Sequence, residues 1–249
     1  MTLPPGFFDK PFAHRALHGQ GAPENSAEAI LAAVEAGYGI EIDVQLSQDG
    51  AAMVFHDYGL ERLTGQPGTV QTISAAELSS LPLLGGETGA PTLREALTIV
   101  SGRVPLVIEI KDQDGAMGPN VGRLARAVAE ALKAYDGLVA VMSFNPHAVA
   151  AMADLAPNIP RGLTTCDFSQ ADWPVLKAAR RKELAQIRDF DRVGASFISH
   201  DSRALRDAPV AALKAKGTAI LTWTIKSQAE AHAALEVADQ ITFEGYTPA

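Results

Sequence analysis

The stretch "GIEIDVQLSQDGAAMVFHD", residues 39–57, decides how the rest of the chain is interpreted. It has the pattern of a strand that runs into a hairpin, but it carries charged residues where a strand buried on both faces would carry valine or isoleucine. The Asp-Gly pair at 49–50 is a strong signal for a two-residue turn, which would set Asp43 opposite His56. The spacing therefore predicts that the hairpin brings a histidine beside two carboxylates, those of Glu41 and Asp43.

Around this stretch, short runs rich in β-branched residues alternate with stretches of helical periodicity. The runs that predict strands are "PFAHR", "IEIDVQ", "PLVIEIK", "LVAVMSF", "RGLTT", "ASFISH", "AILTWT" and "QITF". Helical periodicity lies between most of them, as in "NSAEAILAAVEAG" and "VGRLARAVAEALKAY". Because such alternation implies parallel strands joined by crossovers, eight units in 249 residues predict a (β/α)8 barrel.

Local signals refine this α/β fold class. Asn25, with a glutamate three residues later, resembles a capping box at the start of the first helix, and Gly37 stands where that helix should stop. Residues 63–91 form a glycine-rich and proline-rich insertion, which we expect to be an extended loop with one short helix. We therefore predict a TIM barrel with a small hairpin and loop insertion after the second strand, in a single domain over residues 1–249.

Composition excludes several classes of function. A net charge of −8 without a cluster of lysine and arginine argues against nucleic-acid binding. No run approaches the roughly 18 uncharged apolar residues of a membrane span, and no basic start precedes an apolar run at the N-terminus. The single cysteine, Cys166, cannot form an internal disulfide, which suits a reducing compartment. We expect a soluble cytoplasmic protein without stable membrane insertion, either monomeric or paired.

Charged residues gather near the C-terminal ends of the predicted strands. Alternation places Glu41 and Asp43 on one face of their strand, and it does the same for Glu109 and Lys111 in "VIEIK". The His-Arg pair that ends "PFAHR" joins the same rim. Active sites of such barrels are built at this rim, whereas charges deep in the interior would be costly without partners. Three carboxylates here can hold a hard divalent cation, which offsets their mutual repulsion.

The order of short motifs along the chain resembles a known enzyme family. His-Arg, "PEN", Glu-x-Asp-Val, "DG", His-Asp and "EIK" follow one another, and "MSF", "IPRGL" and "LTWTI" continue downstream. This combination resembles the glycerophosphodiester phosphodiesterases over almost the whole chain. The resemblance implies a barrel enzyme that hydrolyses glycerophosphodiesters, such as glycerophosphocholine, to glycerol 3-phosphate and an alcohol, using calcium or magnesium.

The resemblance also implies roles for individual residues. The metal ligands would be Glu41, Asp43 and Glu109. The general acid and base would be His14 and His56, and the phosphate would be bound by Arg15 and Lys111. A phosphodiester gains negative charge on attack, so a cation and two basic side chains would stabilise the transition state. One histidine would deprotonate the nucleophile, either water or the neighbouring glycerol hydroxyl, and the other would protonate the leaving alkoxide.

Two segments depart from the family's pattern, and both should border the pocket. Ala16 replaces the glycine that usually follows His-Arg, and Phe243 and Glu244 stand where the family commonly has Thr-Asp-x-Pro. The predicted catalytic set remains intact, but the alcohol part of the substrate stays open. Trp223, on a late strand, is a candidate to stack over the choline or glycerol part of a substrate, with a core aromatic as the default interpretation.

Other functional classes remain open from the sequence. A related barrel that attacks phospholipids at a membrane surface should expose aromatic or basic side chains on its rim loops. A non-catalytic binder of phosphate esters should have lost at least one histidine or acidic ligand, and all five positions are filled. A metal-dependent aldolase barrel fits by fold alone, but it would not need both histidines in these motifs.

Overall fold

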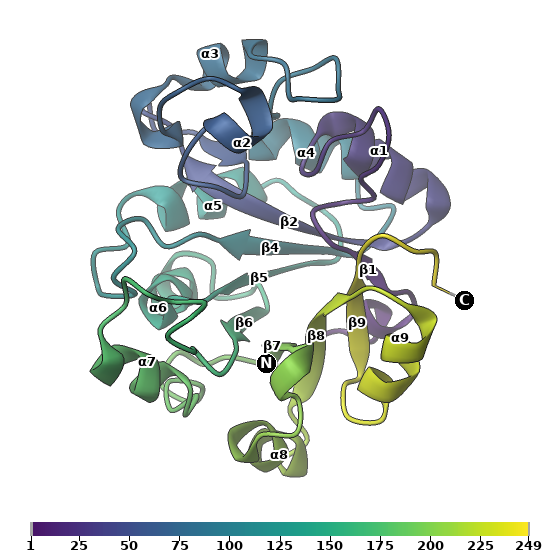
Figure 1. Cartoon of the computed structure of the whole chain (residues 1–249), viewed down its shortest axis with the longest axis vertical. Coiled ribbons are helices and arrows are strands. Elements are labelled where there is room, and N and C mark those ends of the chain that lie inside the picture. Colours follow the sequence, from purple (N-terminus) through teal and green to yellow (C-terminus); the bar gives the residue numbers. More distant parts are fainter. Residues whose placement is uncertain (1, 249) are drawn as a thin grey trace.

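The computed structural model of the chain describes residues 2–248, and eight parallel strands close into a barrel within it (Figure 1). The barrel closes because β1 (Phe12–Ala13) pairs with both β2 (Gly39–Leu46) and β9 (Gln240–Phe243). The intervening strands are β4 (Leu106–Ile110), β5 (Val139–Ser143), β6 (Arg161–Thr165), β7 (Phe197–Asp201) and β8 (Ala219–Ile225). All eight predicted strands are present, and the TIM-barrel prediction is confirmed.

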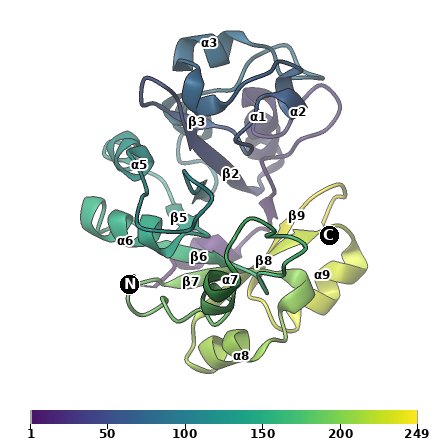
Figure 2. The ribbon, with the colours of Figure 1, turned by 60° about the vertical axis from the view of Figure 1, so that its left-hand side comes forward.

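Helices cover the outside of the barrel (Figure 2). They are α1 (Ala27–Ala36), α4 (Leu93–Val100), α5 (Leu124–Leu132), α6 (Pro146–Leu155), α7 (Ala178–Leu184), α8 (Ala208–Ala215) and α9 (Gln228–Leu235). Their apolar residues share the main core with outward-facing strand residues such as Ile42, Ile108 and Val141. Among residues 2–248, no helix is long and apolar enough to cross a bilayer.

Large apolar side chains fill the N-terminal end of the barrel interior. Phe7 of the short 3-10 helix η1 (Pro5–Phe8) stacks on Phe12 of β1, with ring centroids 6.0 Å apart. The same cluster contains Phe197, which packs so closely on Gly162 of β6 that a Cβ there would lie 2.5 Å from the ring. This end is therefore closed by packing, and the buried Gln240 at the start of β9 donates a hydrogen bond to the carbonyl of Phe8 there at 2.9 Å.

The hairpin is present, but its register differs from the prediction by one residue. β3 (Ala52–Val54) lies outside the barrel and pairs antiparallel with the end of β2. The N–H of Phe55 donates to the carbonyl of Asp43 at 3.0 Å, so the prediction that His56 lies opposite Asp43 was wrong. The cause is a loop of three residues, 48–50, whose final glycine has a φ of 92°. This left-handed glycine lengthens the two-residue turn that the Asp-Gly pair predicted.

The insertion predicted over residues 63–91 carries more helix than predicted, and its first helix begins before residue 63. The name insertion is used from here on for the whole segment 58–91. It contains α2 (Glu61–Thr64), the 3-10 helix η2 (Val70–Thr72) and α3 (Ala75–Ser80), which lie together beyond the hairpin (Figure 1). Met53 and Phe55 pack beneath it in a separate apolar cluster that includes Leu60, Leu63 and Leu78. Helices of this length show no periodicity in the sequence, which is why only one of the three was predicted.

The first helix begins one residue later than predicted. Ser26 is the N-cap of α1, and its hydroxyl accepts a hydrogen bond from the N–H of Ala29 at 3.1 Å. Asn25 precedes it with a φ of 59°, and its side chain bonds to Asp43 instead of capping the helix. The capping assignment of Asn25 was therefore wrong, whereas the helix ends at Gly37 as predicted, with a φ of 73°.

Candidate active site

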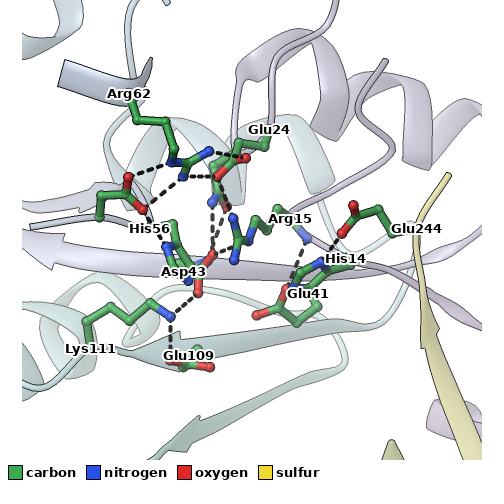
Figure 3. A network of polar contacts seen from close by, with 12 residues as sticks. His14, Arg15, Glu24, Glu41, Asp43, His56, Arg62, Glu109, Lys111 and Glu244 are labelled. Carbon is green, nitrogen blue, oxygen red and sulfur yellow. Dashed lines mark hydrogen bonds and ion pairs between the residues drawn. The ribbon is translucent and has the colours of Figure 1, made fainter. Parts of the chain in front are cut away.

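The predicted site residues meet at the C-terminal mouth of the barrel (Figure 3). One cavity of about 120 Å³ is lined on its charged side by His14, Arg15, Glu41, Asp43, His56, Glu109 and Lys111. It is lined on the other side by Met142, Phe144, Thr164, Ser199, Trp223, Thr224 and Thr242. His56 reaches this cavity despite the shifted hairpin register, because it follows the end of β3 and is not bound to the ladder.

Three carboxylates from two neighbouring strands form one buried cluster. One oxygen from each of Glu41, Asp43 and Glu109 lies within 4.8 Å of the others. They meet because Asp43 of β2 pairs in register with Glu109 of β4, and Glu41 lies two residues earlier on the same face. Burial, together with the charges of Asp43 and Glu109, raises the pKa of Glu41 well above its ordinary value. An oxygen-only donor set that is crowded in this way fits a hard divalent cation.

Two basic side chains border the carboxylate cluster. The Nζ of Lys111 lies 2.7 Å from Oδ1 of Asp43 and 2.6 Å from Oε1 of Glu109. Burial opposes the charge of Lys111, but these two carboxylates outweigh it and raise the pKa of the ammonium group. The Nε of Arg15 lies 3.6 Å from Oδ2 of Asp43 and, within residues 2–248, is buried without a hydrogen-bond partner. Arg15 therefore has a donor left for a further anion.

Each histidine has a carboxylate at its Nδ1. The Nδ1 of His14 lies 2.7 Å from Oε2 of Glu244, and the Nδ1 of His56 lies 2.6 Å from Oδ1 of Asp57. A carboxylate in this place orients the ring and favours the tautomer that leaves Nε2 without a proton. Burial lowers the pKa of His14 more than the hydrogen bond that its Nδ1 donates to Glu244 raises it. His14 is therefore biased toward the neutral form, which can accept a proton.

Sequence reasoning missed Glu244 as a site residue and treated it only as a departure from a family pattern. The carboxylate reaches His14 because β9 pairs with β1 when the barrel closes, although the two residues are 230 positions apart. Ala16, the other departure, has a φ of 65°, in the left-handed region that favours glycine. Its N–H donates to the carbonyl of Glu41 at 2.9 Å, which holds the backbone beside the site.

Asn25 was interpreted only as a helix cap, and neither Glu24 nor Arg62 was assigned to the site. The amide of Asn25 donates to Oδ2 of Asp43 at 2.9 Å and accepts the N–H of Asp43 at 3.1 Å. Glu24 accepts hydrogen bonds from both Arg15 and Arg62. The "PEN" motif could have signalled Glu24 and Asn25, whereas Arg62 lies in the insertion, where no motif was recognised.

Trp223 lines the cavity opposite the charged side. Its Nε1 donates to the carbonyl of Ser199 at 3.0 Å, and its ring meets that of Phe144 edge-on with centroids 5.7 Å apart. The indole is thus fixed at the cavity wall, where one part can contact a ligand while the rest packs against its aromatic neighbour.

A closed barrel with histidines, basic side chains and candidate metal ligands at its C-terminal mouth has the architecture of a TIM-barrel enzyme. The chain belongs to the glycerophosphoryl diester phosphodiesterase family, which it matches over residues 14–239. The glycerophosphodiester phosphodiesterase of Bacillus altitudinis is 34% identical over 166 residues, covering 64% of this chain and 67% of that protein. A solved Oleispira antarctica phosphodiesterase, in complex with the product sn-glycerol-3-phosphate, has a TM-score of 0.79 and 26% identity, covering 95% and 93% of the two chains. The protein is therefore a phosphoric diester hydrolase.

Proposed function

We propose that this enzyme hydrolyses glycerophosphodiesters to glycerol 3-phosphate and an alcohol, and that it requires calcium or magnesium. The observation that carries the proposal is the single cavity in which three buried carboxylates, two basic groups and two histidines meet. Glu41, Asp43 and Glu109 would hold the cation. When bound, the cation supplies electrostatic stabilisation of the negative charge that the phosphate gains on attack.

Arg15 and Lys111 bind the phosphate in this proposal. Both line the cavity, and the unpartnered Nε of Arg15 gives the guanidinium a donor for a phosphate oxygen. Lys111 is held charged between Asp43 and Glu109, so its positive charge lies close to the cavity throughout the reaction. The two groups stabilise developing charge without having to reorganise, since the fold has already positioned them.

The two histidines transfer the protons. His14 takes the proton from the nucleophile, either water or the neighbouring glycerol hydroxyl, because burial biases it toward the neutral form. As the new phosphorus–oxygen bond forms, the bond to the alcohol breaks, and His56, which must enter this step protonated on both ring nitrogens, donates its Nε2 proton to the departing alkoxide. Attack by water gives glycerol 3-phosphate directly. Attack by the glycerol hydroxyl gives a cyclic phosphate, which water then opens, with His56 taking the proton from the water and His14 returning its proton to the glycerol oxygen. Glu244 and Asp57 hold the two rings through their Nδ1 atoms.

The test is a substrate screen on the purified protein. Glycerophosphodiesters with choline, ethanolamine, glycerol and inositol head groups are each incubated with calcium or magnesium after chelation, and released glycerol 3-phosphate is measured. We expect release from at least one diester, loss of activity in chelator and recovery when the cation is restored. Undiminished turnover in excess chelator, with metal analysis showing no bound ion, would exclude the metal requirement. An absence of glycerol 3-phosphate from every diester would exclude the substrate class.

A further inference from the structure

One guanidinium group from the insertion contacts two carboxylates at the edge of the site (Figure 3). The Nη1 and Nη2 atoms of Arg62 donate to the two oxygens of Glu24 at 2.8 and 2.7 Å. The Nε and Nη2 atoms donate to the two oxygens of Asp57 at 2.6 and 2.9 Å. Both contacts use the planar fork of arginine, a geometry that the single ammonium group of lysine does not reproduce.

Each of these carboxylates also holds a residue that lines the cavity. Oε1 of Glu24 accepts a hydrogen bond from Nη1 of Arg15 at 2.8 Å. Oδ1 of Asp57 lies 2.6 Å from Nδ1 of His56. Arg62 is therefore one residue removed both from the proposed phosphate-binding group and from the proposed proton donor, although it does not line the cavity itself.

Arg62 has no comparable role in holding the fold together. Its side chain is 47% exposed, whereas those of Glu24 and Asp57 are 13% and 24% exposed. The insertion is anchored by buried apolar residues, including Leu60 and Leu63, which flank Arg62. Because exposed ion pairs contribute little to stability, the loss of Arg62 should leave the insertion folded. The loss of Arg62 would, however, leave Glu24 and Asp57 without the guanidinium group that bridges them.

We infer that Arg62 is a positioning residue, which fixes Glu24 and Asp57 so that Arg15 and His56 are oriented toward the phosphodiester. The inference rests on the proposed function, since it assigns Arg62 to the same reaction. It also makes the insertion a part of the active site, because α2 supplies a side chain that joins the two arms of this network.

The experiment compares Arg62→Ala and Arg62→Lys with the wild type for kcat, KM and thermal unfolding. Loss of a residue that orients a catalytic group typically costs about tenfold to a hundredfold in activity, and we expect kcat/KM to fall by that amount in Arg62→Ala. The Lys variant should recover little, because it restores the charge without the fork. The matched control is Arg206→Ala, which removes an exposed arginine paired with Glu236 at 2.7 Å and should behave as wild type.

A second comparison separates positioning from a merely structural role. If Arg62 acts partly through Asp57, adding Arg62→Ala to Asp57→Asn should cost less activity than adding it to the wild type, because only the Glu24 arm is then left to lose. Unchanged kcat and KM in Arg62→Ala, measured beside an active wild type, would overturn the inference. A loss of activity in Arg62→Ala that is fully explained by unfolding of the variant would also overturn the inference.

The inference can also be tested without turnover. Binding of sn-glycerol 3-phosphate to the wild type and to Arg62→Ala is measured by calorimetry. Weaker binding to the variant is expected, because Arg15 loses its orientation through Glu24. Equal affinities would show that Arg62 does not position Arg15. If the wild type hydrolyses no diester, the proposed function fails, while this comparison still decides whether Arg62 supports an anion site.

Discussion

The two halves of the cavity wall are built from different kinds of side chain. The half formed by β1, β2 and β4 carries acids, bases and the carboxylate cluster, while the half formed by β5 to β9 contributes hydroxyl groups, methionine and aromatic rings. The three charged strands are neighbours in the barrel, so their side chains reach one another across adjacent strands. In the proposed function, the charged half would carry out the reaction and the other half would shape the space for the substrate.

The two halves also differ in what their burial costs. Glu41, Asp43 and Glu109 are buried carboxylates that repel one another, and they are retained although such a cluster opposes folding. The uncharged half instead resembles an ordinary protein interior, with Phe144 and Trp223 packed edge-on. Substitutions should therefore have large effects on activity in the charged half and small ones in the uncharged half.

The largest effect is expected from the two histidines. His14→Ala and His56→Ala should each lower kcat by about a hundredfold to ten-thousandfold, the usual contribution of a general acid or base, while the fold stays intact. Removing both should cost little more than removing one, because residues that act in one mechanism are not additive. Turnover and circular dichroism of the three variants check this, and near-wild-type turnover in both single variants would contradict the assignment.

Glu41→Gln should lower activity through the metal. The substitution removes a charged ligand from the buried cluster, so weaker metal affinity should come first, and raising the metal concentration should restore part of the activity. Titrating turnover against calcium and magnesium for the wild type and the variant provides the measurement. The histidine variants are the control, since added metal should not rescue them. A metal dependence in Glu41→Gln that matches the wild type would remove Glu41 from the ligand set.

Glu244→Gln should reduce kcat by about tenfold to a hundredfold, because His14 loses the group that orients its ring. It should also move the pH profile. The carboxylate of Glu244 raises the pKa of His14, so removing it should lower that pKa further, and the acid limb of kcat should shift to lower pH.

The matched control for this prediction is Glu236→Gln, an exposed glutamate that pairs with Arg206 outside the cavity. Its kcat and pH profile should match those of the wild type. An acid limb that stays in place, or moves to higher pH, in Glu244→Gln would show that Glu244 does not act on His14 in this way.

The smallest effect is expected in the uncharged half. Trp223→Leu, which removes the aromatic ring, should raise KM for glycerophosphocholine by about threefold to tenfold, the range of a cation–π contact with a choline group, and leave kcat nearly unchanged. A diester with an uncharged glycerol head group serves as the comparison, because it should lose less. Equal changes in KM for both substrates would assign Trp223 to packing rather than to recognition of the head group.

Much of the barrel and of the charged half could be predicted from the sequence, because the relevant signals are local. An extended chain alternates its side chains with a period of two, so the shared face of Glu41 and Asp43 follows from their spacing alone. Strands alternating with helices likewise predicted parallel strands, whose C-terminal ends meet at one rim. These patterns placed Glu109 and Lys111 beside the first two carboxylates, where the structure has them.

Other features depended on contacts between distant or irregular segments. The hairpin register was mispredicted because loop length, and not the Asp-Gly pair alone, decides which residues face each other. The contact of His14 with Glu244 exists only because the barrel closes, and that of Arg62 with Glu24 only because two segments 38 positions apart come together. The sequence by itself determined which residues share a strand face, since alternation is a local property of an extended backbone. The tertiary structure decided which groups orient the histidines and the arginine, since that depends on how distant segments pack together.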